Sequence, residues 1–161
     1  MHLEESVLIQ RTPEEVWAYL SDVSNVSSWD RGVAGVQTTS QVPPGVGFEF
    51  DTLGHPGRKG DEGIKAKMSY RITKANPTDG CTVQLTNSDG NARYFKAAEW
   101  RFRVEPVAQA ARVFCAAHFK LKPAYIFLAP FLYLMKKGIR SDLESLKHAL
   151  EEGRELGLSG T

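Results

Sequence analysis

Cysteine is scarce in this chain, which has only Cys81 and Cys115 among its 161 residues. Both lie in runs where apolar and polar residues alternate, so they fit buried thiols better than a disulfide framework, with a single bridge between them as the alternative. An excess of either charge is also missing, since 20 Lys and Arg face 19 Asp and Glu, which gives a formal net charge of +1. The charge balance therefore gives no argument for nucleic acid or an anionic membrane as a partner.

A basic leader and a long hydrophobic run are absent too. The first ten residues, MHLEESVLIQ, carry acidic side chains where a secretory signal needs basic ones. The most apolar window, residues 124–135, is too short and too close to charged residues to span a bilayer. We therefore expect a cytoplasmic protein without stable membrane insertion.

The motifs of common catalytic sites are not found either. The four histidines, His2, His55, His118 and His148, do not stand at metal-ligand spacing, so we expect no metal and no cofactor. The glycine-rich stretch GHPGRKGDEG lacks the order of a phosphate-binding loop, and no serine lies in a GxSxG motif. These absences argue against a zinc site, a nucleotide cradle and a serine hydrolase.

What the sequence does contain is a long helical pattern at residues 123–152. Apolar residues recur there every three or four positions, which is the spacing of one helix face. The first half is apolar nearly all round, which predicts burial on more than one side, and Pro130 should kink or split the helix. A helix of this length needs a large apolar surface to pack on, which the upstream strands must supply. The periodic residues are Leu128, Leu132, Met135, Ile139, Leu143, Leu146 and Leu150.

The upstream strands are recognised by alternating apolar and polar residues. A first strand is predicted at 3–9, followed by a helix that Thr12 caps with Pro13 and Glu15, and by a short second helix ending near Trp29. Because no βαβ alternation follows, the seven strands should form an antiparallel sheet that curves around the long helix in an α+β fold. The six further strands are predicted at 32–39, 47–52, 64–75, 81–87, 93–104 and 111–121.

Both ends of this pattern resemble a known family. The stretch VLIQRTPEEVWAYLSDVSNVSSWDRGV at 7–33, and the strand through 119–121 followed by a helix with DLESLK at 142–147, are similar to the polyketide cyclase/dehydrase family of the START-like (SRPBCC) superfamily. The resemblance covers essentially the whole chain and implies a single START-like ligand-binding domain over residues 1–161 with the helix-grip fold. It also implies an elongated apolar cavity between sheet and helix. The superfamily shares no catalytic motif, so no catalytic residue is transferred.

A few polar side chains fall on the inner face of the predicted sheet, which would face such a cavity. Tyr70 is central in its strand and is the best candidate to hydrogen-bond a carbonyl or enolate oxygen, with a core tyrosine bonded to backbone as the alternative. Glu5 could act as a general base, unless it lies in water at a fraying strand end. Tyr125, at the start of the long helix, comes close to Glu5 in the expected topology. We therefore predict Tyr70, Glu5 and Tyr125 as the catalytic residues.

The predicted ligand-binding residues line one contiguous apolar space between the inner face of the sheet and the first half of the long helix. Small residues on that face, such as Ala98, Cys115 and Ala117, leave room for a void. The predicted ligand-binding set is Phe48, Phe50, Met68, Asn87, Tyr94, Trp100, Phe102, Ala117, Phe119, Leu128, Leu132 and Met135.

Three functions are compatible with this reading. The first is a cyclase or dehydratase that encloses and orients a polyketide or similarly apolar, oxygenated substrate. The second is a non-catalytic carrier or sensor of a lipid, quinone or steroid-like ligand. The third is a partner-binding module that uses the apolar segment 124–134 as its contact. The expected partner is a hydrophobic small molecule and not nucleic acid, and the protein is expected to be a monomer or a homodimer.

Overall fold

A computed structural model describes residues 1–55 and 67–158 of the chain. The chain begins with β1 (His2–Ile9), α1 (Pro13–Leu20), the 3₁₀ turn η1 (Val23–Asn25) and α2 (Val26–Trp29). Strands follow as β2 (Val33–Thr38), β3 (Glu49–Gly54), β4 (Lys67–Asn76), β5 (Gly80–Leu85), the turn η3 (Gly90–Tyr94), β6 (Phe95–Val107) and β7 (Ala110–Leu121). The last elements are the turn η4 (Pro123–Leu128), α3 (Ala129–Leu132) and α4 (Met135–Leu158).

The seven strands form an antiparallel sheet in the order β1-β7-β6-β5-β4-β3-β2. Strands β2 to β7 follow one another in the sheet as they do in the sequence, which is the arrangement expected for strands joined by short turns. The first strand lies beside the last, with Glu5 opposite Cys115. The predicted α+β fold, with seven antiparallel strands and a long C-terminal helix, is confirmed.

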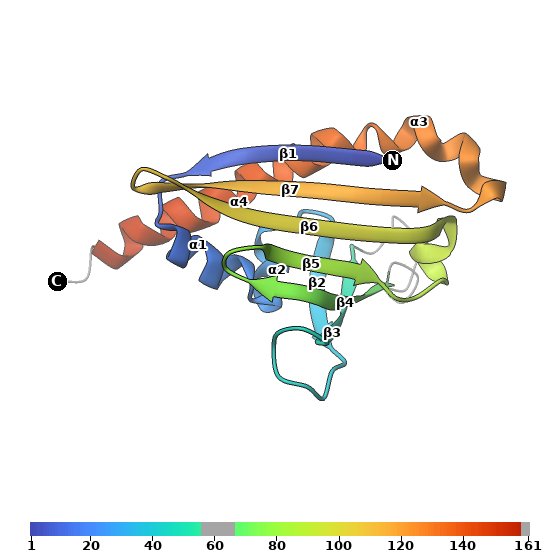
Figure 1. Ribbon diagram of the computed structural model, residues 1–161, viewed down its shortest axis with the longest axis horizontal. Coiled ribbons are helices and arrows are strands. Elements are labelled where there is room, and N and C mark those ends of the chain that lie inside the picture. Colours follow the sequence, from blue (N-terminus) through green and yellow to red (C-terminus); the bar gives the residue numbers. More distant parts are fainter. Residues whose placement is uncertain (56–66, 159–161) are drawn as a thin grey trace.

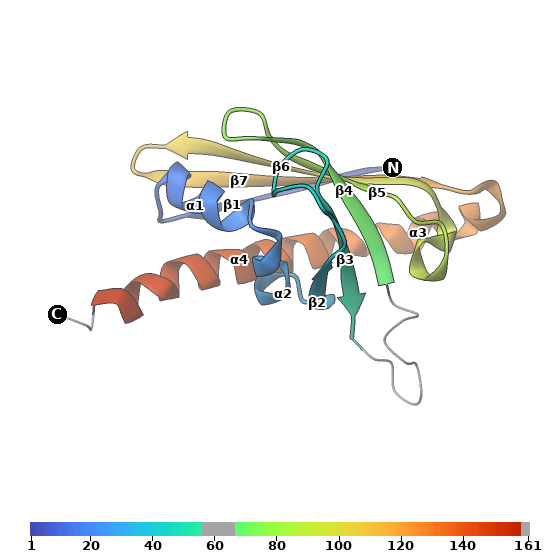
Figure 2. The same ribbon diagram turned by 90° about the horizontal axis from the view of Figure 1, so that it is seen from below.

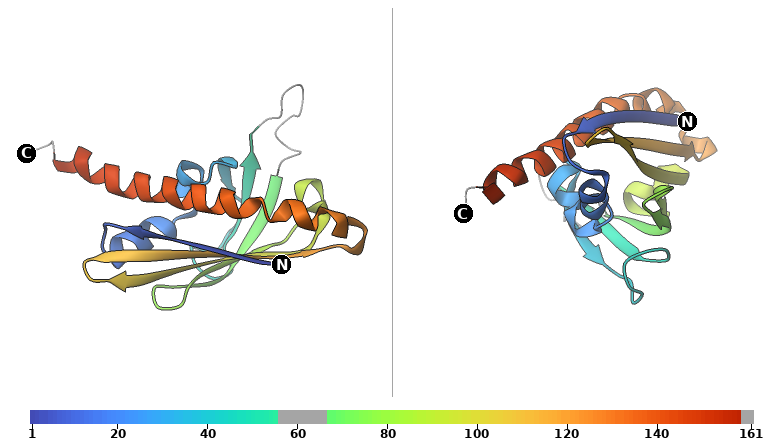
Figure 3. Two further views of the ribbon diagram at one scale, coloured as in Figure 1. Left: turned by 90° about the horizontal axis from the view of Figure 1, so that it is seen from above. Right: turned by 60° about the vertical axis from the view of Figure 1, so that its left-hand side comes forward.

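The sheet bends strongly along its width. Strands β1, β7 and β6 run along the length of α4, whereas β2 and β3 run across it (Figures 1 and 2). Helix α4 packs on β1 and α2, while α1 packs on β6 and β7. Figure 3 shows the two short helices beside α4, inside the curve of the sheet. This arrangement places the segment from α1 to β2 between the bent sheet and the middle of the long helix.

The core lies between the inner face of the sheet and α4. The second half of the predicted helix face is confirmed, because Ile139, Leu143, Leu146 and Leu150 are all buried. They pack with the inward side chains of β1 and β7, among them Val113. The burial of this stripe explains why a helix with many charged residues on its other positions stays attached to the sheet.

The first half of the predicted helix differs from the expectation. Pro130 stands in the first turn of α3, where its missing N–H costs nothing, and the chain forms η4, α3 and α4 in place of one kinked helix. Leu132 is buried, but the expected burial on more than one side is wrong. None of the helices in the described ranges is long and apolar enough to cross a bilayer. The exposed apolar residues here are Ile126, Phe127, Phe131, Tyr133 and Leu134, each 63–66% exposed.

Several strand boundaries also differ from the prediction. Strand β3 begins two residues later than expected, and residues 93 and 94 belong to η3 in place of the start of β6. The pairing of β6 with β7 shifts register between Phe95 and Ala97, and this irregularity turns Lys96 to solvent. The first three residues of the strand predicted at 64–75 lie outside the described residues.

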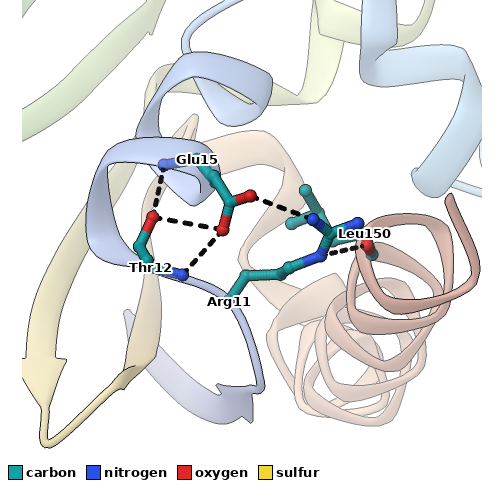
Figure 4. Close-up of polar contacts among 4 residues, drawn as sticks. All are labelled: Arg11, Thr12, Glu15 and Leu150. Atoms are coloured by element: carbon teal, nitrogen blue, oxygen red, sulfur yellow. Dashed lines mark hydrogen bonds and ion pairs between the residues drawn. The ribbon is translucent and has the colours of Figure 1, made fainter. Parts of the chain in front are cut away.

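Helix α1 begins as the sequence predicts. The Thr12 hydroxyl accepts a hydrogen bond from the Glu15 backbone N–H at 3.3 Å, and the Glu15 carboxylate accepts one from the Thr12 N–H at 3.0 Å (Figure 4). Arg11 connects this capping box to α4, because its Nη1 pairs with Glu15 at 3.0 Å and its Nε donates to the Leu150 carbonyl oxygen at 2.8 Å. The cap therefore holds the start of α1 against the long helix.

We expect Thr12→Ala to lower the free energy of unfolding by about 1 kcal/mol, because it removes the side-chain acceptor for the Glu15 N–H. Thr12→Ser keeps a hydroxyl in the same place and is the matched control. Denaturant unfolding of the three proteins, followed by circular dichroism, measures the difference. Equal midpoints for the alanine and serine variants would contradict a capping role.

Candidate functional site

A cavity of about 100 Å³ lies between the sheet, the segment from α1 to β2, and one turn of α4. A single buried water needs only ~10–15 Å³, so the cavity has room for several waters or for a small organic group. Most of its wall is apolar, which favours a hydrophobic ligand. The apolar wall residues are Leu20, Val23, Val26, Val33, Phe50, Val83, Trp100, Phe102, Ile139 and Leu143.

Both cysteines belong to this wall. Cys81 and Cys115 are free and buried, which confirms the prediction of buried thiols. Burial raises the pKa of the Cys81 thiol to about 11, and burial likewise raises the pKa of Cys115. Because the thiolate is the reactive form of cysteine, neither side chain is a nucleophile near neutral pH.

Tyr70 enters the wall from the middle of β4, as predicted. Its ring stacks on Phe50 with a centroid distance of 5.8 Å. Burial raises the pKa of the Tyr70 phenol to about 12, and the charge of Asp30 acts in the same direction. The hydroxyl donates to the Met68 sulfur at 3.6 Å, which is a weak acceptor. The phenol is therefore neutral at physiological pH and can donate to a stronger acceptor, such as a ligand carbonyl oxygen.

Two carboxyl groups also face the cavity, Asp30 from the loop after α2 and Asp142 from α4. Asp30 accepts a hydrogen bond from the Gly32 N–H at 2.8 Å, and Asp142 accepts one from the Arg31 N–H at 3.2 Å. Burial raises the pKa of Asp30 to about 6, and the negative charge of Asp142 adds to the effect. Burial also raises the pKa of Asp142, although the Arg31 N–H and guanidinium oppose it. Asp30 is thus a carboxyl that gains and loses its proton close to neutral pH.

Trp29 presents an unusual polar atom at the same wall. The side chain is 7% exposed, and its indole Nε1 is buried without a hydrogen-bond acceptor among the described residues. The ring meets Phe102 edge to face with a centroid distance of 5.8 Å. A buried N–H without an acceptor is costly, so it is rare in folded proteins unless a ligand or water completes it. The indole N–H is therefore a buried donor that lacks an acceptor among the described residues.

Four of the predicted site residues meet at this cavity: Tyr70, Phe50, Trp100 and Phe102. The remaining apolar candidates pack against other side chains in the part of the structure that is described. Phe48 and Met68 belong to the cluster around Tyr70, and the other members belong to the main core or its edge. Those others are Ala117, Phe119, Leu132 and Met135, while Leu128 is half-buried on η4.

The cavity faces a later turn of the long helix than the sequence predicted. We expected it opposite Leu128, Leu132 and Met135, but Ile139 and Leu143 form the helical side of the wall. The space at the earlier position is filled by aromatic rings, because Phe119 contacts Phe95 and Trp100 at centroid distances of 5.4 and 5.5 Å. The bulge near residue 96 turns Phe95 inward and so helps to close that end of the sheet.

The remaining polar candidates lie elsewhere. Glu5 is paired with Lys136 at 3.7 Å, and Tyr125 meets Tyr94 edge to face at a centroid distance of 5.1 Å. Asn87 accepts a hydrogen bond from the Ser69 N–H at 2.9 Å and so extends the strand pairing. Among the described residues, the wall of this cavity includes none of these four side chains. Their predicted roles in catalysis or binding stay predictions.

The cavity wall also includes Trp29, Asp30 and Asp142, which were not predicted from the sequence. Asp30 follows a short helix in a loop, where no periodic pattern reveals which side chains are buried. For Asp142 a signal was available, since it lies three residues after Ile139 and four before Leu146 and thus shares their helix face. A carboxyl on the buried face of an amphipathic helix is costly unless it has a function or a partner.

No group of three His, Cys, Asp or Glu side chains in the described ranges comes together as a set of metal ligands. The polar groups of the cavity instead include the Tyr70 hydroxyl and the carboxyls of Asp30 and Asp142. Such a set can bind an oxygen atom of a ligand and exchange a proton with it.

A search of curated proteins gives no match. The structure is similar to the Zhui aromatase/cyclase from Streptomyces sp. R1128, with a TM-score of 0.75 and 12% identity over 94% of this chain and 93% of that one. It is also similar to norcoclaurine synthase from Thalictrum flavum, with a TM-score of 0.72 and 11% identity over 94% and 87%. A third similar structure, TTHA0849 from Thermus thermophilus, gives 0.68 and 15% over 95% and 99%.

At these identities the structural similarities establish the fold alone, and the family follows from the sequence. The family described as "Polyketide cyclase / dehydrase and lipid transport" has a sequence model that matches residues 1–151. Since this match extends over nearly the whole chain and agrees with the helix-grip arrangement of sheet and helix, the chain belongs to the polyketide cyclase/dehydrase and lipid transport family of START-like (SRPBCC) proteins.

Proposed function

We propose that the protein binds an apolar, oxygen-bearing small molecule in the cavity and acts on it as a cyclase or dehydratase. The observation that carries the proposal is the presence of Asp30, with a pKa of about 6, and of the neutral phenol of Tyr70 in one mostly apolar cavity. A carboxyl poised near the working pH can both remove and return a proton during a reaction. The family description supports the same reaction class.

In an aldol-type ring closure, the Asp30 carboxylate takes a proton from the carbon beside a ligand carbonyl, and the C–H electron pair forms an enolate. The Tyr70 hydroxyl donates a hydrogen bond to the enolate oxygen, where negative charge develops. The enolate carbon then attacks a second carbonyl of the same ligand, and the new alkoxide takes the proton back from Asp30. In a dehydration, the Asp30 carboxylate first removes the proton from the carbon between the carbonyl and the hydroxyl-bearing carbon. The carboxylic acid so formed then protonates the hydroxyl, which leaves as water while the C=C bond forms.

A carrier of a lipid, quinone or steroid-like ligand is the second candidate, and the largely apolar wall of the cavity favours it. The two functions differ in what they require of the polar groups. A carrier needs donors only to hold a ligand oxygen, and it makes no use of a carboxyl that titrates near neutral pH. The effects of a Tyr70 substitution on turnover and on ligand binding therefore distinguish the two candidate functions.

We expect Tyr70→Phe to lower turnover ~10- to 1000-fold with little change in folding, because it deletes a hydrogen bond that strengthens as charge develops on the ligand oxygen. Short poly-β-ketone thioesters serve as substrate probes, and chromatography measures product formation. Glu5→Gln is the matched control: Glu5 pairs with Lys136 away from the cavity, so its turnover should equal that of the unmodified protein. An equal loss of turnover in Glu5→Gln would instead support Glu5 as the general base, as predicted from the sequence.

Ligand binding is measured in the same proteins by the fluorescence of Trp29 and Trp100, which border the cavity. A carrier would bind the probes without forming product, and Tyr70→Phe would weaken its binding by about 0.5–1.5 kcal/mol, the value of a neutral hydrogen bond. If the unmodified protein forms no product from probes that it binds, the catalytic proposal fails and the carrier stands. If neither binding nor product is seen, both fail for this ligand class.

A further inference from the structure

A cluster of large apolar side chains is exposed on the link between β7 and α4. We name this cluster the apolar tip and define it as Ile126, Phe127, Phe131, Tyr133 and Leu134, each 63–66% exposed. Figures 1 and 2 show this link at one end of the molecule, past the end of β7. Five such residues within nine positions concentrate exposed apolar surface on one short link, and large exposed apolar surfaces mark interaction sites on soluble proteins.

The apolar tip is exposed because it lies opposite the side of the link that packs on the core. Leu132 is buried and Met135 is half-buried, at positions three residues apart. Phe131 and Leu134 each stand one position before these residues, and both are exposed, as is Phe127. These exposed side chains contribute little to the core, so their apolar character has another reason.

Charge is segregated around the apolar tip in a way that the overall balance conceals. Between Glu105 and Asp142 the sequence contains no Asp or Glu, although the whole chain has 19. Basic residues stand on both sides of the tip within this acid-free region. They are Lys120 and Lys122 before it, and Lys136, Lys137 and Arg140 after it. Of these, Lys120, Lys137 and Arg140 are exposed, whereas Lys136, whose side chain is 53% exposed, pairs with Glu5 of β1 at 3.7 Å.

We propose that the apolar tip docks the protein reversibly on an anionic lipid surface. The aliphatic and aromatic side chains enter the headgroup region, where aromatic rings are favoured, and the flanking lysines and arginine contact anionic headgroups. Either signal alone gives only marginal membrane binding, whereas an apolar anchor beside a basic cluster gives stable yet reversible association. Such docking needs no spanning helix.

The other occupants fit these observations less well. A second copy of the chain would bring two basic flanks together across a symmetric contact, and the like charges would repel. A protein partner would have to offer a concave acidic cleft to a protruding end of the molecule. A bilayer of anionic lipid avoids the repulsion between basic flanks and needs no preformed cleft. It deforms around a protruding apolar tip and carries negative charge on every side of it.

The test uses the full chain and lipid vesicles in a sedimentation assay at 0.1 M salt, without any small-molecule ligand. We expect binding to vesicles of phosphatidylcholine with 30% phosphatidylserine, and at least ~10-fold weaker binding to phosphatidylcholine alone. The double variant Phe127→Ser with Phe131→Ser should weaken binding ~10- to 100-fold, because two exposed rings no longer enter the lipid. Lys137→Gln with Arg140→Gln should weaken it ~30-fold, since each basic residue near the surface contributes about a factor of five.

Val46→Ser is the matched control, because Val46 is 65% exposed but lies outside the apolar tip. It should bind vesicles as the unmodified protein does, and thermal melting of all variants verifies that they fold. The proposal is overturned if the unmodified protein does not bind anionic vesicles, or if Val46→Ser loses binding as strongly as the phenylalanine variant. It is also overturned if the tip variants convert a dimer to a monomer but leave vesicle binding unchanged. Since no ligand is present, these outcomes do not depend on the proposed catalysis.

Discussion

Leu146→Ala is expected to lower the free energy of unfolding by about 2–5 kcal/mol, which is the usual cost of truncating a fully buried leucine. Leu146 is 0% exposed in the middle of the stripe by which α4 packs on the sheet. The loss combines the transfer free energy of the removed methyl groups with the void that they leave, since neighbouring strands cannot collapse into it. Denaturant unfolding monitored by circular dichroism measures the shift in midpoint.

Two other helix positions make this prediction specific. Glu144→Ala changes an exposed side chain on the same helix and should stay within about 0.5 kcal/mol of the unmodified protein. Leu143→Ala also removes a buried leucine, but its side chain borders the cavity, so the truncation enlarges a space that already exists. We expect Leu143→Ala to change probe binding as well as stability, and Leu146→Ala to change stability alone. An unchanged midpoint in Leu146→Ala would mean that α4 is not held by the sheet.

The fold could be predicted because each element carries its period in the sequence. Alternation in the strands and the three-and-four spacing of Ile139, Leu143 and Leu146 both report one buried face, and burial of those faces against each other determines the architecture. The capping box at Thr12 is equally local, since its partners lie within four residues. Features that depend on a few consecutive residues were therefore predicted correctly.

The lining of the cavity was predicted only where it shares that period. Tyr70, Phe50, Trp100 and Phe102 project from strands, and alternation alone directs them inward. The segment that closes the cavity has no period, so neither the orphan indole of Trp29 nor the buried carboxyl beside it could be placed by counting. At the apolar tip the error was of the other kind, because the sequence predicted buried residues there and the structure exposes them. Composition shows that residues are apolar, but it does not show which of them have a surface to pack against.

Asp30→Asn is expected to lower turnover by ~10²- to 10⁴-fold, the usual contribution of a general acid–base residue, and at the same time to stabilise the fold at alkaline pH. An aspartate in the unfolded chain titrates near 3.8, whereas burial raises the pKa of Asp30 to about 6 in the folded protein. Between these values the folded state binds more protons than the unfolded state, so stability falls as the pH rises from about 4 to above 6.

The amide of the variant keeps the oxygen that accepts the Gly32 N–H but carries no charge to bury. The difference between 3.8 and about 6 corresponds to at most about 3 kcal/mol. Because Asp30 is partly reached by solvent, we expect Asp30→Asn to be about 1–3 kcal/mol more stable than the unmodified protein at pH 8, with the difference shrinking toward zero near pH 4. Unfolding titrations across this range measure it.

The pH dependence of turnover tests the same carboxyl independently. If Asp30 acts as the base, the rate should rise with pH through its pKa of about 6 and then level off. Asp142→Asn removes the negative charge that helps to raise this pKa, so the rising limb should move to lower pH while Asp30 stays in place. The amide can still accept the Arg31 N–H, which keeps the local structure. A limb that stays at the same pH in Asp142→Asn would show that another group supplies the base, whatever the effect of Asp30→Asn on the rate.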